Sequence, residues 1–289
     1  MEEKDYPALY KAANDASMKS QDRHLGLVRS YSYALIAAAG LGVYGIEDVV
    51  SAVGAALLIV GAIFISFMMI LKKDEDVWYR ARAVAESVKT SAWRFMMRGD
   101  PYGDAESMEV VKANLRQRMG RILREHKDLS HELGGDVSKE EQITQFMCDV
   151  RAKALQDRVI FYRNHRIDEQ RTWYAKKSGY NKRQSQIWFS ILIACQAIAV
   201  TLVILRVAQP EWGYWPTEVF VVAAGSALTW IQVKRFRELA SAYGLTAHEI
   251  GIIRGELDNV KDEEGFSQFV IDSESAFSRE HTQWLARKD

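Results

Sequence analysis

The sequence has little cysteine, with two residues among 289, Cys148 and Cys195. Cys148 lies in a charged region and Cys195 in an apolar one, so they do not form the spaced set that a disulfide scaffold or a thiolate metal site requires. The two-residue period of a β-strand is also missing over any appreciable length. The predicted fold is therefore all-α.

An excess of one charge sign and the familiar catalytic motifs are missing as well. The 38 Lys and Arg are interleaved with the 38 Asp and Glu rather than gathered into a basic stripe, so we expect no nucleic-acid partner. No HExxH pair, phosphate-binding loop or nucleophile elbow occurs. His126 and His131 could share a metal ion, but they fall on different helical faces, which favours ordinary solvated histidines. We expect no enzymatic activity, no metal and no cofactor.

Charge is absent from four windows, residues 30–46, 49–71, 184–205 and 219–233. A helix needs about 20 residues to cross roughly 30 Å of hydrocarbon, and the second and third windows reach that length. The first and fourth are shorter, but Arg29 can snorkel beside the first, and aromatic residues precede the fourth. The sequence thus predicts four membrane spans. The alternative, buried helices of a large soluble core, is disfavoured because such helices rarely lack every charge over this length.

Basic residues predict the orientation of the spans. The connections within the two span pairs, residues 47–48 and 206–218, contain one basic residue, Arg206, whereas Lys and Arg flank the other ends of all four spans. Because cytoplasmic segments carry the excess of basic residues, both termini and the central segment are expected to be cytoplasmic. The acidic N-terminus does not resemble a cleavable signal peptide, so we expect the first span to direct insertion as a multi-pass inner-membrane protein.

Long amphipathic helices are predicted on the cytoplasmic side. No Gly or Pro interrupts residues 62–98, so the second span is expected to continue as one stalk up to a turn at residues 99–103. Apolar residues at helical spacing mark one face of the stalk and one face of a returning helix: Val77, Ala81, Val84, Val88, Ala92 and Phe95, then Met108, Val111, Leu115, Met119 and Ile122. This pattern predicts a helical hairpin.

The order of elements predicts two similar halves. Gly134 and Gly135 end the first half, and the spacing from Ser138 to Glu141 is that of a capping box opening the next helix. The first unit is predicted at residues 1–135, with spans at about 30–46 and 49–71 and cytoplasmic helices at about 72–98 and 105–130. The second is predicted at 136–289, with a long helix at about 139–183, spans at about 184–205 and 216–233, and cytoplasmic helices at about 234–260 and 263–286.

Four segments carry a resemblance to a known family. Residues 161–178 read FYRNHRIDEQRTWYAKKS ahead of the third span, and residues 274–284 read ESAFSREHTQW. Residues 9–17, LYKAANDAS, and 78–87, WYRARAVAES, flank the first hairpin. The second half resembles the SLATT family of two-transmembrane domains, and the first half resembles a second SLATT type. The chain therefore looks like a tandem of the two.

The resemblance implies a membrane effector of prokaryotic conflict systems. Such domains are associated with nucleotide-generating synthases, nucleotide-sensing SLOG domains or reverse transcriptases, and they are thought to form pores that depolarise the cell in an anti-phage suicide response. No synthase or sensor domain is recognised in these residues. The resemblance therefore implies a trigger from outside them, a nucleotide second messenger or a separately encoded synthase or sensor protein.

Weakly polar and small residues within the spans form the candidate site. The spans hold no ionisable side chain of the kind used in proton relays, which disfavours an ion-coupled pump. Weakly polar faces supply five candidate pore-lining residues: Ser51, Ser66, Ser190, Thr201 and Thr229. The alternative is that small residues only allow close packing and that the hydroxyls bond their own backbone.

Two further sets of residues are assigned to assembly in the bilayer. Four glycines are assigned to close helix packing: Gly40, Gly54, Gly61 and Gly225. Three tryptophans are assigned as interfacial anchors: Trp188, Trp212 and Trp215. Because four spans of one chain can close without an aqueous lumen, we expect a homo-oligomeric pore. The alternative function is a membrane-anchored scaffold that recruits a cytoplasmic partner without conducting.

Overall fold

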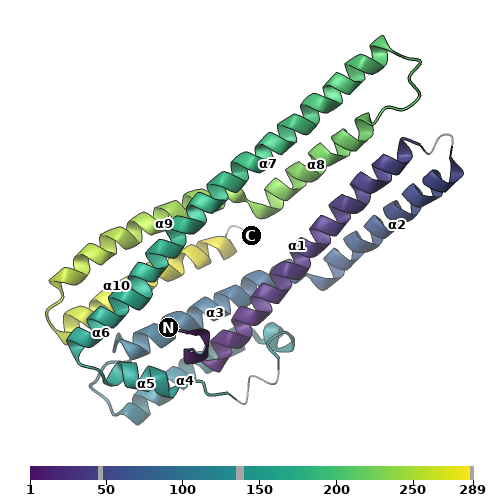
Figure 1. The fold of residues 1–289 in the computed structure, drawn as a ribbon. Helices are drawn as coiled ribbons and strands as arrows, with labels where there is room; N and C mark the ends of the chain where they lie inside the picture. The colour runs from purple at the N-terminus through teal and green to yellow at the C-terminus, as the bar shows by residue number, and fades with distance from the viewer. Residues whose placement is uncertain (45–47, 135–139, 287–289) are drawn as a thin grey trace. The chain divides into compact units, whose positions relative to one another are not determined.

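The computed structural model describes residues 1–44, 48–134 and 140–286, and none of these residues lies in a β-strand (Figure 1). The predicted all-α fold is confirmed. The chain divides into two compact units that alternate along the sequence. The core unit comprises Met1–Gln21, Glu75–Lys176 and Ala242–Asp289, and the apolar unit comprises Asp22–Asp74 and Lys177–Ser241. Each unit thus contains residues from both predicted halves.

The apolar unit contains two helical hairpins, whose paired helices run side by side in Figure 1. The first pairs α1 (Ala8–Gly42) with α2 (Val49–Lys72), and the second pairs α7 (Glu169–Ala208) with α8 (Thr217–Lys234). Asp48 begins α2, because its side chain accepts hydrogen bonds from the backbone N–H groups of Val50 and Ser51 at 3.2 and 2.9 Å. Both α1 and α7 begin in the core unit and end in the apolar unit.

Two helical segments among the described residues are long and apolar enough to cross a membrane, Val49–Met96 and Leu155–Ala208. Four were predicted, so the number of candidate spans is corrected to two. The mean hydropathy of α1 and α8 is too low because both helices contain polar residues: Ser30, Tyr31, Ser32 and Tyr33 in α1, and Thr217, Glu218 and Gln232 in α8. Residues 45 and 46 of the first predicted span lie outside the described residues.

Large apolar side chains of the apolar unit are exposed rather than buried. Only 6% of each candidate window is buried. The exposed side chains follow both candidate spans: Leu57, Ile59, Val60, Ile63, Phe64 and Phe67 on α2, and Phe189, Ile193, Val200, Val203 and Ile204 on α7. Such a contiguous apolar surface on a folded chain marks a region that another apolar phase or partner covers.

Within the described residues, six further helices contribute to the core unit and pack around one apolar core. These helices are α3 (Asp74–Met96), α4 (Met108–Glu125), α5 (Gln145–Ala152), α6 (Leu155–Tyr162), α9 (Phe236–Glu256) and α10 (Glu263–Ala286). The predicted faces of the first helical hairpin are buried: Ala81, Val84, Val88, Ala92 and Phe95 on α3, and Val111, Leu115, Met119 and Ile122 on α4. Met108, also placed on the α4 face, is 40% exposed.

The predicted continuous stalk is wrong, because the helix breaks at Lys73. Lys73 adopts φ 47 and ψ 34, a left-handed conformation that ends α2 before α3 begins. Next to the break, the side chain of Asp74 is buried and accepts a hydrogen bond from Arg23 Nε at 2.9 Å. Arg235 adopts the same φ of 47 between α8 and α9. The two hairpins therefore end in the same way, which supports the repeat of elements.

The long helix predicted at 139–183 is also wrong. Gln145 begins α5, and the Thr144 hydroxyl caps it by accepting from Met147 N at 3.3 Å. The chain is extended at Lys153 and Ala154 before α6, and a π-helical turn, Arg163–Asp168, joins α6 to α7. Residues 135–139, which hold the predicted boundary and the start of the capping box, lie outside the described residues.

Candidate functional site

The core unit buries an ion pair between Arg166 and Glu274. Their side chains are 2% and 0% exposed. Arg166 lies on the π-helical turn, where Nε donates to Glu274 Oε1 at 2.8 Å and Nη2 donates to Glu274 Oε2 at 2.7 Å. This two-pronged geometry is the strong form of a charged hydrogen bond. π-Helical turns are rare and occur frequently at functional sites, so this pair is a candidate site.

Two neutral donors complete the coordination of the Glu274 carboxylate. The Tyr162 hydroxyl donates to Oε1 at 2.9 Å, and the Thr90 hydroxyl donates to Oε2 at 3.0 Å. Burial alone would lower the pKa of Arg166, but the adjacent Glu274 carboxylate outweighs it and raises that pKa. Burial, followed by the Glu274 charge, raises the pKa of Tyr162. Arg166 therefore stays charged and Tyr162 stays protonated.

Aromatic rings enclose the Arg166 guanidinium. Its central carbon lies 4.8 Å from the ring centroid of Phe277 and 5.9 Å from that of Trp93. The Trp93 indole N–H in turn donates to the Tyr6 hydroxyl at 3.2 Å. The network thus joins Tyr6, Thr90 and Trp93, from the first predicted half, to residues of the second.

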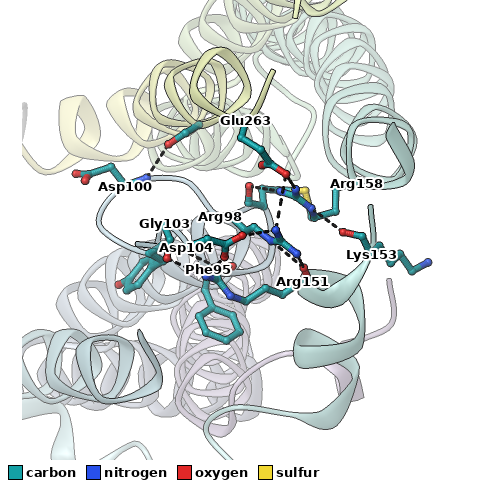
Figure 2. Close-up of polar contacts among 12 residues, drawn as sticks. Phe95, Arg98, Asp100, Gly103, Asp104, Arg151, Lys153, Arg158 and Glu263 are labelled. Atoms are coloured by element: carbon teal, nitrogen blue, oxygen red, sulfur yellow. Dashed lines mark hydrogen bonds and ion pairs between the residues drawn. The ribbon is translucent and has the colours of Figure 1, made fainter. Parts of the chain in front are cut away.

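A second set of buried arginines surrounds the turn that follows α3 (Figure 2). Arg151 of α5 donates to the carbonyls of Phe95 at 2.8 Å, Tyr102 at 2.6 Å and Gly103 at 3.0 Å, and to Asp104 Oδ1 at 2.9 Å. These carbonyls lie at and beyond the C-terminal end of α3, where the regular hydrogen bonds of the helix end, and the Phe95 carbonyl also accepts from the Arg98 backbone N–H at 3.3 Å. Burial lowers the pKa of Arg151, whereas Asp104 acts in the opposite direction.

Arg158 and Arg98 extend this arrangement to α6 and α10. Arg158 donates to the carbonyls of Met97 at 3.0 Å and Lys153 at 3.1 Å, and it pairs with Glu263. Arg98 donates to the Arg151 carbonyl at 2.9 and 3.0 Å and pairs with Asp104. Figure 2 shows these side chains converging on the turn. The guanidinium groups donate to carbonyls and carboxylates of the chain itself. The arginines therefore hold the turn in place.

The five candidate pore-lining residues lie in the apolar unit, and most of their hydroxyls bond within their own helix. Ser66, Thr201 and Thr229 donate to the carbonyl four residues earlier, at 3.1, 2.9 and 3.0 Å. Ser51 donates to Asp48 Oδ2 at 2.6 Å. Ser190 and Thr201 are both exposed on α7. Their assignment to a pore stays a prediction.

The glycines assigned to helix packing differ from one another. A Cβ added at Gly54 would lie 3.0 Å from Leu41 Cδ1, so Gly54 lies close to α1. A Cβ at Gly40, Gly61 or Gly225 would meet nothing within 4 Å. Within the described residues, Gly54 alone of the four thus lies close to a second helix.

The three assigned tryptophans occupy two places. Trp188 packs against the small α7–α8 cluster of Leu192, Ala224 and Ala227, with its ring centroid 5.9 Å from that of Trp230. Trp212 and Trp215 stack at 5.4 Å in the connection between α7 and α8. Trp215 is buried, and its indole N–H donates to the Trp212 carbonyl at 2.8 Å.

The buried charges were not predicted, although the sequence contains a signal for two of them. Glu274 follows the buried Val270 by one helical turn and therefore lies on the same face of α10 as that apolar residue. Arg166 follows the buried Tyr162 in the same way. A charge at a core-facing position indicates a buried partner of opposite sign.

No described group of three or more His, Cys, Asp or Glu residues could hold a metal ion. Gly40, Gly42 and Gly45 have the spacing of a dinucleotide-binding fingerprint, but that fingerprint follows a strand, whereas Gly40 and Gly42 end α1. A polar cavity of about 440 Å³ lies between the end of α9 and the start of α10, lined by Glu256, Lys261, Asp262 and Phe269 among others. The Asp262 carboxylate there already accepts from Gly265 N at 2.8 Å.

The apolar hairpins are exposed, and the helical core unit buries charged pairs within an apolar core. These features define the class of the protein: an all-α protein with hairpins suited to a bilayer. The chain belongs to the SLATT family. Residues 7–159 match SLATT_3, the SMODS and SLOG-associating 2TM effector domain 3, and residues 162–284 match SLATT_1, the SMODS and SLOG-associating 2TM effector domain 1. No curated protein and no solved structure matches the chain. The predicted tandem is confirmed, and it supports a role as a membrane effector.

Proposed function

We propose that the protein is an effector of a prokaryotic anti-phage system that forms or gates a membrane pore when it receives a cytoplasmic signal. The observation that carries this proposal is the tandem of two-transmembrane effector domains on a chain whose apolar helices are exposed. Exposed apolar surface costs roughly 25 cal/mol per Å² in water and nothing in hydrocarbon, which favours insertion.

We propose that α1 and α8, although less apolar than the two candidate spans, cross the membrane beside them, with both termini on the cytoplasmic side of the inner membrane. Each matched domain is described as a two-transmembrane domain, and α1 and α8 each pair with a helix from a candidate span. Basic residues flank the ends opposite the two hairpin connections. A reporter fused after Asp289 or inserted at Gly134 should be active as a cytoplasmic fusion. Periplasmic activity at either position would contradict this topology.

The pore is proposed to form between copies of the chain. The open space beside Gly40, Gly61 and Gly225 leaves room for close approach by a helix of another copy. Ser190 and Thr201 are eleven residues apart and therefore share one face of α7. A single, strictly monomeric species in native membranes would contradict the assembly.

The test of the pore is membrane potential in cells that express the protein with its neighbouring genes. Depolarisation of a potential-sensitive dye is expected, and Thr201→Leu should reduce it because a larger apolar side chain narrows and dries the path. Val203→Leu, on the opposite side of α7, is the matched control and should depolarise like the wild type. Equal depolarisation by both variants would contradict the proposal that α7 lines the pore.

The alternative function is a membrane-anchored scaffold. The hydrogen bonds from Ser66, Thr201 and Thr229 to their own helices favour it, because these hydroxyls are already satisfied without water. A scaffold would remain inserted and leave the dye signal unchanged. Supplying or withholding the neighbouring genes tests the proposed trigger, a nucleotide second messenger or a separate synthase or sensor. In either function the chain is proposed to act without catalysis or a cofactor.

A further inference from the structure

Two basic side chains of the apolar unit lie over one tryptophan near the ends of its helices, and the charge of a third acts on one of them. We call Arg29 of α1, Lys177 of α7 and Lys234 of α8 the basic cluster. The Arg29 guanidinium carbon and Lys234 Nζ each lie 5.8 Å from the ring centroid of Trp230. Lys177 Nζ lies 6.0 Å from the ring centroid of Tyr180 on α7, and its positive charge lowers the pKa of Lys234. The cluster therefore joins helices from both hairpins.

At Lys234, the neighbouring cations have a larger effect than the one acid that opposes them. Burial, together with the charges of Arg29 and Lys177, lowers the pKa of Lys234, and Asp22 is the acid that opposes them. Two other acids of the apolar unit have basic partners outside the cluster, since Asp74 pairs with Arg23 at 2.9 Å and Glu238 pairs with Arg235. An anion placed between the three cations would offset their mutual repulsion.

The position of the cluster indicates which anion would fit. Arg29 directly precedes the first charge-free window, and Lys234 directly follows the last. The Trp188–Trp230 pair lies at the same place, as aromatic residues do at the headgroup level of a bilayer. The next turns of α7 and α8 expose apolar side chains, among them Ile187, Ile191 and Leu228.

We propose that the basic cluster binds the phosphate of an anionic phospholipid headgroup, whose acyl chains lie along the exposed apolar side chains of α7 and α8. Basic sites between helices at a membrane surface bind such headgroups. The bound lipid connects α1 to α7 and α8 and so stabilises the contact between the two hairpins. This proposal rests on the insertion proposed above, because only an inserted chain meets the headgroup layer.

The test measures lipid binding to the full-length protein in detergent micelles by native mass spectrometry. The lipids are phosphatidylglycerol and the zwitterionic phosphatidylcholine, and wild type should prefer phosphatidylglycerol. Each basic residue near an anionic headgroup contributes roughly a fivefold factor, so the triple variant Arg29→Gln, Lys177→Gln, Lys234→Gln should bind phosphatidylglycerol about a hundredfold more weakly. The matched control, Lys182→Gln, Arg183→Gln, Arg237→Gln, removes the same charge elsewhere in the apolar unit and should change binding less than about fivefold.

The outcomes separate the lipid site from its alternatives. An equal loss in both triple variants would show general attraction to anionic lipid and overturn the site. Displacement of phosphatidylglycerol by equimolar inorganic phosphate would assign the cluster to a soluble anion instead. Resistance of wild type to carbonate extraction tests insertion separately. If wild type resists extraction but shows no lipid preference, the lipid site fails and the proposed function stands. If wild type is extracted, insertion fails and the lipid site fails with it.

Discussion

Single residues of the core unit carry a large share of its specificity, and Glu274 is the clearest case. Its carboxylate receives four hydrogen bonds, from Arg166, Tyr162 and Thr90, without contact with solvent. Removing one member of a buried ion pair leaves the other charged and unpaired, which is strongly unfavourable. Exposed ion pairs contribute far less.

Breaking the buried pair should therefore destabilise the protein. Glu274→Gln and Arg166→Met should each lower the free energy of unfolding by about 3–5 kcal/mol. Arg254→Gln, which removes the solvent-exposed pair with Asp168, should cost far less than either change. The double variant Arg166→Met, Glu274→Leu should lose less than the sum of its single changes. Denaturant unfolding in detergent measures all four, and equal losses for Glu274→Gln and Arg254→Gln would contradict the assignment.

Lys89 gives the core unit a dependence on alkaline pH. Burial lowers its pKa to about 8 from an ordinary value of 10.5, although the nearby Glu86 acts in the opposite direction. Compared with the unfolded chain, the folded state therefore favours the neutral amine. Its contribution to stability is fully present above pH 10.5 and is lost as pH falls through about 8.

Lys89→Met removes this dependence. Near neutral pH, the free energy of unfolding of the variant should be larger than that of wild type. The difference should shrink as pH rises from about 8 to 10.5. Thermal unfolding of both proteins across this range measures the difference. A difference that stays constant with pH would show that Lys89 does not titrate in the folded state within this window.

At the scale of elements, the breaks at Lys73 and Arg235 set where each hairpin ends. A left-handed conformation costs an L-residue roughly 1–2 kcal/mol, and glycine adopts it without that cost. Lys73→Gly should therefore stabilise the protein by up to about 1 kcal/mol. Lys72→Gly, one residue earlier at the last residue of α2, relieves no such strain and should destabilise the protein by less than about 1 kcal/mol. Thermal unfolding of both variants checks the opposite signs, and two losses would contradict the break.

The sequence predicted those elements that repeat a simple period. Apolar residues at helical spacing identified the buried faces of α3 and α4, because burial alone determines that pattern. No glycine lies at the break at Lys73, so the sequence does not indicate it. The break at Lys153 depends on Arg158, which donates to the Lys153 carbonyl from the next helix. Tertiary contacts decide such boundaries, so a pattern within one segment does not contain them. The partners of Arg151 and Arg158 could not be predicted for the same reason, because they are tertiary contacts.

At the scale of the whole molecule, the two matched domains share one core. The core unit takes residues 7–21 and 75–159 from the first domain and residues 162–176 and 242–284 from the second. The hydrogen bond between Thr90 and Glu274 and the contact of Arg166 with Trp93 cross from one domain to the other. Neither domain alone can complete this core.

Separate expression of the two domains tests this dependence. Residues 1–160 and 161–289 should each be unstable alone, because each exposes apolar core residues such as Trp93 or Phe266 that the other covers. Co-expressed, the two fragments should co-purify and regain the protease resistance of the intact chain. Two separately folded, protease-resistant fragments would contradict the shared core.

The shared core also restricts how such a tandem can change over evolutionary time. A domain that folds alone can be exchanged by recombination at its boundary, whereas here an exchange would separate Glu274 from Thr90 and Arg166 from Trp93. A recombinant would have to acquire a partner with a matching charge and matching rings at once. The two domains should therefore be inherited as one block, and their substitutions should be coupled across the junction although the chain reads as two modules.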